Sequence, residues 1–250
     1  MKLLVLTTSY PSGPSDAAGA FVAELSGVLQ ERGFSITTVA MELPGGPLAA
    51  LEQGQIWSVG AALARMSVKA RWAAAEADAI LAHWLLPSAL LGVALGRPTI
   101  GVAHGGDVRL LARMPWLRKA LVTRLAGVVA VSREAGAALE ALNTLVTPMG
   151  VHAADFGPPA VLPPGPLKAL FIGRLVPIKG LPTLLAAMSR TPEATLTVVG
   201  AGPEARLAAR ASSNVTFVGA VGRHALGELL ASHHVVCLPS RAGEGTPRVV

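Results

Sequence analysis

Short apolar runs alternate with longer segments of helical periodicity along the chain. In the first half, β-branched or leucine-rich runs predict strands at residues 2–8, 35–41, 79–82, 99–103, 128–131 and 145–147. Between them, a helix is expected at residues 20–32, ended by Gly33, and another from Pro87, since proline fits a first helical turn. This alternation predicts a mostly parallel sheet with helices on both faces.

The same alternation starts again in the second half of the chain. Residues 158–166 contain five prolines and predict a stiff linker. Beyond the linker, strands are predicted at residues 168–172, 195–199, 215–218 and 235–238. The chain therefore predicts an α/β protein with two Rossmann-like domains, residues 1–157 and 167–250, of which the second has only four clear strands.

Glycines and charged residues gather directly after the predicted strands. They are Gly19; the run His104, Gly105, Gly106 and Asp107; Gly173 and Arg174; Gly200 and Gly202; Gly219; and residues 239–244. Open parallel sheets bind ligands at the carboxyl ends of their strands. Two such sheets facing each other would form a ligand-binding cleft lined by all of these loops.

Arg174 and Lys179 flank a predicted turn between a strand and the helix that starts near Gly180. Backbone amides and the positive end of that helix would help both cations to hold one anion. A diphosphate suits this arrangement, because arginine binds phosphate oxygens in pairs while lysine acts as a point charge. The alternative is a solvated pair of cations at the start of a helix.

Composition narrows the chemistry further. No Asp-x-Asp pair occurs in the sequence, which argues against a magnesium site with paired carboxylates. The formal net charge of +6 favours acidic partners such as phosphates, anionic lipid or nucleic acid. Aromatic residues make up only 4% of the chain, so recognition of single-stranded nucleic acid by base stacking is not expected. One cysteine and no visible export signal lead us to expect a cytoplasmic protein.

Two short patterns favour ordinary explanations. The run that starts Gly200-Ala201-Gly202 matches a loose dinucleotide fingerprint, but no acidic residue lies between Glu204 and Glu228 to bind a ribose, so a nicotinamide cofactor is not expected. The adjacent histidines at positions 233 and 234, near Cys237, resemble metal ligands. Neighbouring residues of a strand point to opposite faces, which argues against a shared metal.

Taken together, segments spread over the whole chain resemble the retaining glycosyltransferases of family 4, which have the GT-B fold. They are residues 8–11 with Gly19, 103–107, 131–134, 148–151 with Phe156, 171–180, 199–204, 215–219, 238–240 and 244–247. The resemblance implies two Rossmann-like domains that face each other across a cleft. It also implies transfer of a hexose from a nucleotide diphosphate sugar to a sugar, glycan or lipid-linked acceptor, with retention and without a metal or other cofactor.

The resemblance also implies roles for single residues in holding the donor diphosphate. Arg174 and Lys179 would bind it and stabilise its charge as the glycosidic bond breaks. Gly173 belongs to the same loop as Arg174, and the Gly19 loop would approach the same phosphates from the first domain.

Other positions are implied to contact the sugar and the base of the donor. His104 would contact the sugar near the reacting centre, and the loop around Val221 would seat the base. Glu244 and the backbone amides of Gly245 and Thr246 would hold the sugar hydroxyls.

The sequence departs from the family pattern at its end. The family has a second glutamate, which binds the ribose, separated by seven residues from the position of Glu244; that place falls two residues after Val250. We therefore expect a truncated second domain and little activity from the chain as given.

Two basic segments suggest a partner other than the donor. Residues 108–133 contain six Lys or Arg, no acidic residue and Trp116, and a smaller group comprises Arg65, Lys69, Arg71 and Trp72. A solvated helix face explains either segment. The functional interpretation is docking onto the anionic inner face of a membrane, which would suit a lipid-linked acceptor.

Three other functions remain open at this point. A similar two-domain fold supports nucleotide-sugar epimerases, which need no acceptor. A non-catalytic chain that binds a nucleotide or a protein partner is the second alternative. A basic nucleic-acid-binding module is the third, but no recognition helix or aromatic platform is visible, so we do not expect nucleic acid as a partner.

Overall fold

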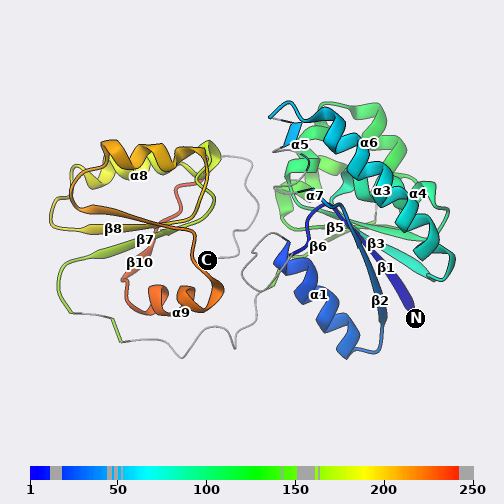
Figure 1. The fold of residues 1–250 in the computed structure, drawn as a ribbon, viewed down its shortest axis with the longest axis horizontal. Coiled ribbons are helices and arrows are strands. Elements are labelled where there is room, and N and C mark those ends of the chain that lie inside the picture. The colour runs from blue at the N-terminus through cyan, green and yellow to red at the C-terminus, as the bar shows by residue number, and fades with distance from the viewer. Residues whose placement is uncertain are drawn as a thin grey trace. The chain divides into compact units, whose positions relative to one another are not determined.

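The computed structural model describes residues 1–11, 19–43, 47, 50–51, 53–141, 143–150, 161–162 and 164–241. The chain divides into two compact units, Met1–Gly150 and Val151–Val250, each with its own parallel sheet (Figure 1). Residues 151–160 lie outside the described part, as does part of the expected linker, so the domain end at residue 157 and the linker stay predictions.

The sheet of the first unit has six parallel strands in the order β2-β1-β3-β4-β5-β6. The strands are β1 (Lys2–Thr7), β2 (Ser35–Ala40), β3 (Ala79–His83), β4 (Thr99–Ala103), β5 (Gly127–Ala130) and β6 (Thr144–Val146). β1 lies between two neighbours and is buried from its third residue onward, which is why its sequence is a continuous apolar run. β2, at the edge of the sheet, alternates between exposed and less exposed residues over its first four positions.

Helices cover this sheet on both faces. The α-helices are α1 (Ala20–Glu31), α3 (Ile56–Ala75), α4 (Leu90–Ala94), α5 (Gly106–Ala112), α6 (Pro115–Val122) and α7 (Arg133–Leu139). Figure 1 shows α1 on one face of the sheet and α3 and α4 on the other, as right-handed crossovers between parallel strands require. α3 turns a line of small and flexible side chains toward the core, namely Ala62, Met66, Ala70 and Ala74.

The chain changes direction sharply after β3. Trp84 has a positive φ of 65°, and the π-helical segment Leu85–Ala89 that follows contains Leu86 with φ −119° and ψ 128°. A proline ring drives the preceding residue out of the α region, so the helical path starts again at Pro87 and leads into α4. This is the position at which the sequence predicted a helix start.

The second unit has a four-stranded parallel sheet in the order β10-β7-β8-β9. Its strands are β7 (Lys168–Ile172), β8 (Thr195–Val199), β9 (Val215–Gly219) and β10 (Val235–Val236); its helices are α8 (Leu181–Met188), α9 (Arg223–Ala231) and the 3-10 helices η3 (Pro177–Lys179) and η4 (Pro203–Arg210). Figure 1 shows α8 and α9 on opposite faces of this sheet. The core lies under α8, where Phe171, Leu196 and Val198 pack with Leu181 and Met188.

The expected fold class is confirmed. Every predicted strand has its counterpart, and both sheets are parallel and covered by helices, as in Rossmann-like domains. The cleft between the two sheets stays a prediction.

Candidate functional site

In the first unit, the loop after β1 ends at Gly19, and any other residue at this position would force the neighbouring backbone to move. Gly19 has φ 70°, and a β-carbon at this position would lie 2.1 Å from the carbonyl oxygen of Ser9. Its carbonyl oxygen accepts a hydrogen bond of 2.8 Å from the Val22 amide, which starts α1. The amino-terminal end of α1 carries the positive partial charge of its first amides.

Four aromatic rings gather at the same edge of this sheet. His83 ends β3, Trp84 follows it, His104 follows β4, and Phe21 comes from α1. The ring centroid of His104 lies 4.7 Å from that of Trp84, 5.0 Å from that of Phe21 and 5.3 Å from that of His83. The predicted site residue His104 therefore sits in a cluster rather than alone.

His83 and His104 share one hydrogen bond. The Nδ1 atom of His83 lies 3.1 Å from the Nε2 atom of His104. Nε2 of His83 is buried and has no partner among the described residues. An unpaired buried donor is rarer than an unpaired acceptor, so we assign the proton of His83 to Nδ1, from which it is donated to His104. His104 then carries its own proton on Nδ1.

Both imidazole rings are neutral at physiological pH. Burial lowers the pKa of His83 to about 4. Burial, together with the charge of His83, lowers the pKa of His104 to about 3. The cluster therefore offers His104 as a neutral hydrogen-bonding group and not as a cation.

Asp107 fixes the backbone around this cluster. Its carboxylate accepts hydrogen bonds from the amides of Leu85 at 2.7 Å, Val108 at 3.0 Å and His104 at 3.1 Å. Burial raises the pKa of Asp107, and the three backbone donors oppose that rise. The carboxylate joins the loop after β3 to the loop after β4, and it thereby sets the position of His104.

In the second unit, Arg174 and Lys179 lie on the loop that follows β7. Arg174 is exposed, while Lys179 is half-buried at the end of η3. Burial and the neighbouring charge of Arg174 both lower the pKa of Lys179. The lysine stem passes Gly173, where a β-carbon would lie 3.7 Å from Lys179 Cε. The two cations are close enough for the charge of Arg174 to act on Lys179.

The glycines after β8 allow two loops to pack directly on each other. A β-carbon on Gly200 would lie 1.8 Å from the carbonyl oxygen of Gly173, and one on Gly202 would lie 2.4 Å from that of Leu175. The Leu175 amide donates to the Ala201 carbonyl at 2.8 Å. These glycines therefore hold the Arg174 loop in place.

Of the remaining predicted site residues in the second unit, one is described by the structure and three are not. Val221 is half-buried in the loop between β9 and α9, at the same carboxyl edge of the sheet as Arg174. Glu244, Gly245 and Thr246 lie outside the described residues. The segment just before them runs along the Lys179 turn, since the Arg241 amide donates to the Ile178 carbonyl at 2.8 Å.

Several residues that lie in the candidate sites of the two units were not predicted from the sequence. His83 ends a buried strand and Trp84 follows it, and a position after a strand is the signal that identified His104. The prediction treated this part of the chain as an apolar strand and helix. Asp107 was placed in the loop after a predicted strand, but no role was predicted for it. Glu204 is buried, and its Oε2 atom has no partner within the described residues.

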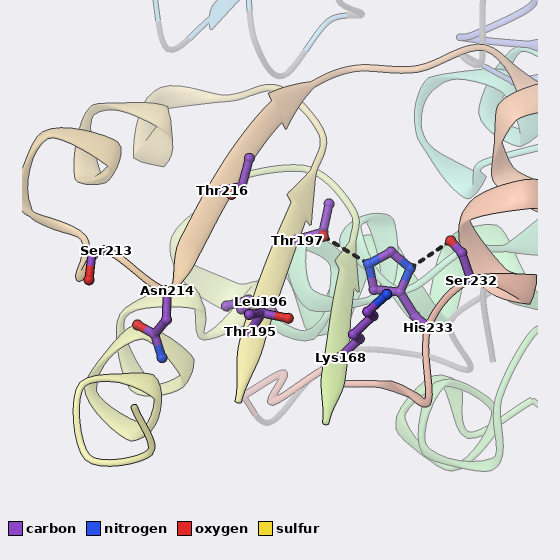
Figure 2. Close-up of a pocket in the computed structure, with 9 residues that line it drawn as sticks. All are labelled: Lys168, Thr195, Leu196, Thr197, Ser213, Asn214, Thr216, Ser232 and His233. Carbon is purple, nitrogen blue, oxygen red and sulfur yellow. Dashed lines mark hydrogen bonds between the residues drawn. The ribbon is translucent and has the colours of Figure 1, made fainter. Parts of the chain in front are cut away.

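A pocket of about 350 Å³ lies at the opposite, amino-terminal edge of the second sheet (Figure 2). His233 spans it, with Nε2 at 2.8 Å from Thr197 Oγ1 and Nδ1 at 2.6 Å from the carbonyl oxygen of Leu229. His234 accepts a hydrogen bond from the Lys168 amide at 3.0 Å. Both histidines thus tie α9 and the chain after it to the strands, and no group of three metal-ligating side chains occurs in the described part of the chain.

The fold defined by these two units is that of GT-B glycosyltransferases. Sucrose-phosphate synthase from Thermosynechococcus elongatus superposes with a TM-score of 0.72 at 20% identity, over 96% of this chain and 76% of that chain. Anabaena HepE, in complex with UDP and glucose, superposes with a TM-score of 0.67 at 19% identity, over 100% of this chain and 77% of that chain. The lipopolysaccharide outer core galactosyltransferase WaaB superposes with a TM-score of 0.62 at 14% identity, over 96% of this chain and 74% of that chain.

A comparison of sequences finds a family that matches most of the second unit. Residues 166–250 match the family described as glycosyl transferases group 1. No curated protein sequence matches the chain. The family match covers the part of the chain that holds Arg174 and Lys179.

Proposed function

We propose that the protein is a retaining hexosyltransferase of family 4 that moves a sugar from a nucleotide diphosphate sugar to a hydroxyl group of its acceptor. The observation that carries the proposal is the cation pair Arg174 and Lys179, at the carboxyl edge of the sheet in a glycosyl transferase group 1 domain. A nucleotide sugar as donor is supported by Anabaena HepE, which was solved with UDP-glucose.

In the proposed reaction, the bond between the anomeric carbon of the sugar and the diphosphate oxygen breaks. The acceptor oxygen forms the new glycosidic bond on the face from which the nucleotide leaves. The acceptor proton passes to the departing diphosphate, and the nucleoside diphosphate is released. Negative charge develops on the departing oxygen, and fixed cations such as Arg174 and Lys179 would stabilise it without moving.

No magnesium ion is needed in this proposal. The aspartates of the chain are isolated, with no Asp-x-Asp pair, so charge on the diphosphate is balanced by protein cations and helix amides. The amino-terminal end of α1, which begins after Gly19, would supply such amides in the first unit.

The sugar would be held from two directions. His104 is neutral and carries its proton on Nδ1, so it suits a hydrogen bond to a sugar hydroxyl. Glu244 and the amides of Gly245 and Thr246 would hold other hydroxyls, and the packing of Arg241 against the Lys179 turn supports their place near the diphosphate. Val221 would border the base.

Titration calorimetry with UDP, GDP and ADP tests the diphosphate site directly. Replacing Arg174 or Lys179 by Ala removes charge-assisted hydrogen bonds of about 1.5–3 kcal/mol each, so we expect each variant to lose roughly tenfold to hundredfold in affinity. Arg190→Ala is the matched control, because Arg190 is exposed at the far end of α8 in the same unit. Equal affinities in all variants would contradict the proposed site.

Mass spectrometry of the donor sugar separates transfer from epimerisation. A transferase releases nucleoside diphosphate as the glycosylated acceptor appears. An epimerase converts the sugar when no acceptor is present, and that result would favour the alternative function.

A further inference from the structure

The face of α3 that points away from the core is apolar. The buried residues Ala62, Met66, Ala70 and Ala74 lie on one side of the helix. On the opposite side, roughly 180° around an axis with 3.6 residues per turn, lie Trp57, Ala61, Ala64, Val68, Trp72 and Ala75. We call these six residues the α3 stripe.

The α3 stripe is open to solvent over the whole helix. Trp57 is 90% exposed, Val68 60% and Trp72 77%. Solvent-facing sides of surface helices are normally polar, and two indole rings in this setting leave a large apolar area without cover. The two rings are about 22 Å apart along the helix axis, at 1.5 Å per residue.

Positive charge flanks the α3 stripe. Arg65 and Lys69 follow one side of it and Arg71 the other, and α3 contains no acidic residue along its 20 residues. Glu42 forms an ion pair with Lys69. Glu76, which follows the last residue of α3, is paired with Lys2. Four cations against two carboxylates leave the surroundings of the stripe positive.

We propose that the α3 stripe is a docking surface for an anionic lipid bilayer, on which α3 lies parallel to the membrane plane. Tryptophan combines an apolar ring with an N–H donor and prefers the boundary between headgroups and acyl chains. Long basic side chains beside an apolar helix face reach anionic headgroups while the face is buried. The proposal does not depend on the transfer reaction.

Two observations favour lipid over other occupants. A symmetric dimer through this face would bring Arg65 and Arg71 of one copy close to the same cations of the other, which costs free energy. The apolar stripe between the cations also differs from a nucleic-acid surface, which would place basic groups along its centre. Among the described residues no helix is long and apolar enough to cross a bilayer, so contact with lipid here is contact with its surface.

Co-sedimentation with vesicles tests the proposal on the full chain. We expect binding at low salt to vesicles of equimolar phosphatidylglycerol and phosphatidylcholine, and weak binding to phosphatidylcholine alone. The variant W57S/W72S should lose roughly tenfold or more in affinity for each ring. The variant R65Q/R71Q should lose about fivefold for each charge. Val161→Ser is the control, since Val161 is 94% exposed but lies in the second unit.

Three results would overturn the proposal. The first is that the unchanged protein stays in the supernatant with anionic vesicles at low salt. The second is that W57S/W72S and R65Q/R71Q bind the vesicles as well as the unchanged protein does. The third is that the protein does not bind vesicles and sedimentation velocity finds a dimer that W57S/W72S abolishes. Both variants alter exposed side chains, and an unchanged far-UV circular dichroism spectrum verifies that each is folded.

Discussion

At the scale of single residues, His83 and His104 make the first unit sensitive to acid. Burial lowers the pKa of His83 to about 4, and burial with the charge of His83 lowers that of His104 to about 3. The unfolded chain binds protons on both rings below about pH 6.5, while the folded unit does not. Their contribution to stability is therefore fully present above about pH 6.5 and is lost as the pH falls toward 4.

Replacing His83 by Asn removes one of these titrating groups and leaves an amide near the position of Nδ1. Between pH 6.5 and 4, we expect the variant to lose about 2–3 kcal/mol less unfolding free energy than the unchanged protein. All four tryptophans belong to the first unit, so denaturant titrations followed by tryptophan fluorescence measure this unit. Parallel stability curves down to pH 4 would refute the prediction.

Lys179 predicts a pH dependence for donor binding. Its pKa is lowered by burial and by Arg174 in the free protein, and a bound diphosphate would raise it again. Binding therefore takes up a proton once the pH exceeds the lowered pKa, and affinity for UDP should fall with rising pH below the usual lysine pKa of about 10.4. Lys179→Arg should move this fall to higher pH, because arginine does not titrate in this range.

Calorimetry across the alkaline range measures both proteins. The comparison concerns the shape of the two pH profiles and not the affinity at neutral pH, since arginine has a longer side chain. Identical pH profiles for the two proteins would show that ligand binding does not change the pKa of Lys179.

At the scale of secondary-structure elements, two helical glycines should respond to alanine in opposite ways. Gly27 in α1 has open space at its β-carbon position, so Gly27→Ala should stabilise the first unit by about 0.5–1 kcal/mol. A β-carbon on Gly92 in α4 would lie 2.8 Å from Thr99 Cγ2, and Thr99 is buried in β4. Gly92→Ala should therefore destabilise the same unit. Denaturant titrations followed by tryptophan fluorescence measure both changes. A gain in stability from both variants would show that α4 can shift away from Thr99 at no cost.

The strands were predictable because a buried parallel strand is a short apolar run bounded by turns. The predicted limits of β7 and β8 match the structure, whereas β10 is two residues long instead of four. Among the described residues β10 pairs with β7 alone, through Val235 and Val236.

The candidate site was predictable only where its residues are close in sequence. Arg174 and Lys179 share one loop, and their proximity follows from the turn between strand and helix. His83 and His104 are 21 residues apart, and only the pairing of β3 with β4 brings their rings together. The sequence contains no local signal for that pairing, nor for the three backbone donors that converge on Asp107.

At the scale of the whole molecule, the two units have separate apolar cores. One core is formed by residues of the first unit around β1 and α3, and the other by residues of the second unit around β7 and α8. The cations proposed to bind the diphosphate lie entirely in the second unit, while every tryptophan lies in the first. A ligand held by Arg174 and Lys179 should therefore stabilise the second core more than the first, in which the amides at the start of α1 would make the remaining contact.

Saturating UDP, which lacks the sugar that His104 would contact, provides the test. At a hundred times its dissociation constant, a ligand of the folded second unit adds about 2.7 kcal/mol to that unit's stability. We expect far-UV circular dichroism, which follows both units, to show a transition that shifts with UDP, while the tryptophan transition of the first unit shifts less. Arg174→Ala should reduce the shift. Equal shifts by both probes would mean that the units unfold as one, or that UDP is held as tightly by the first.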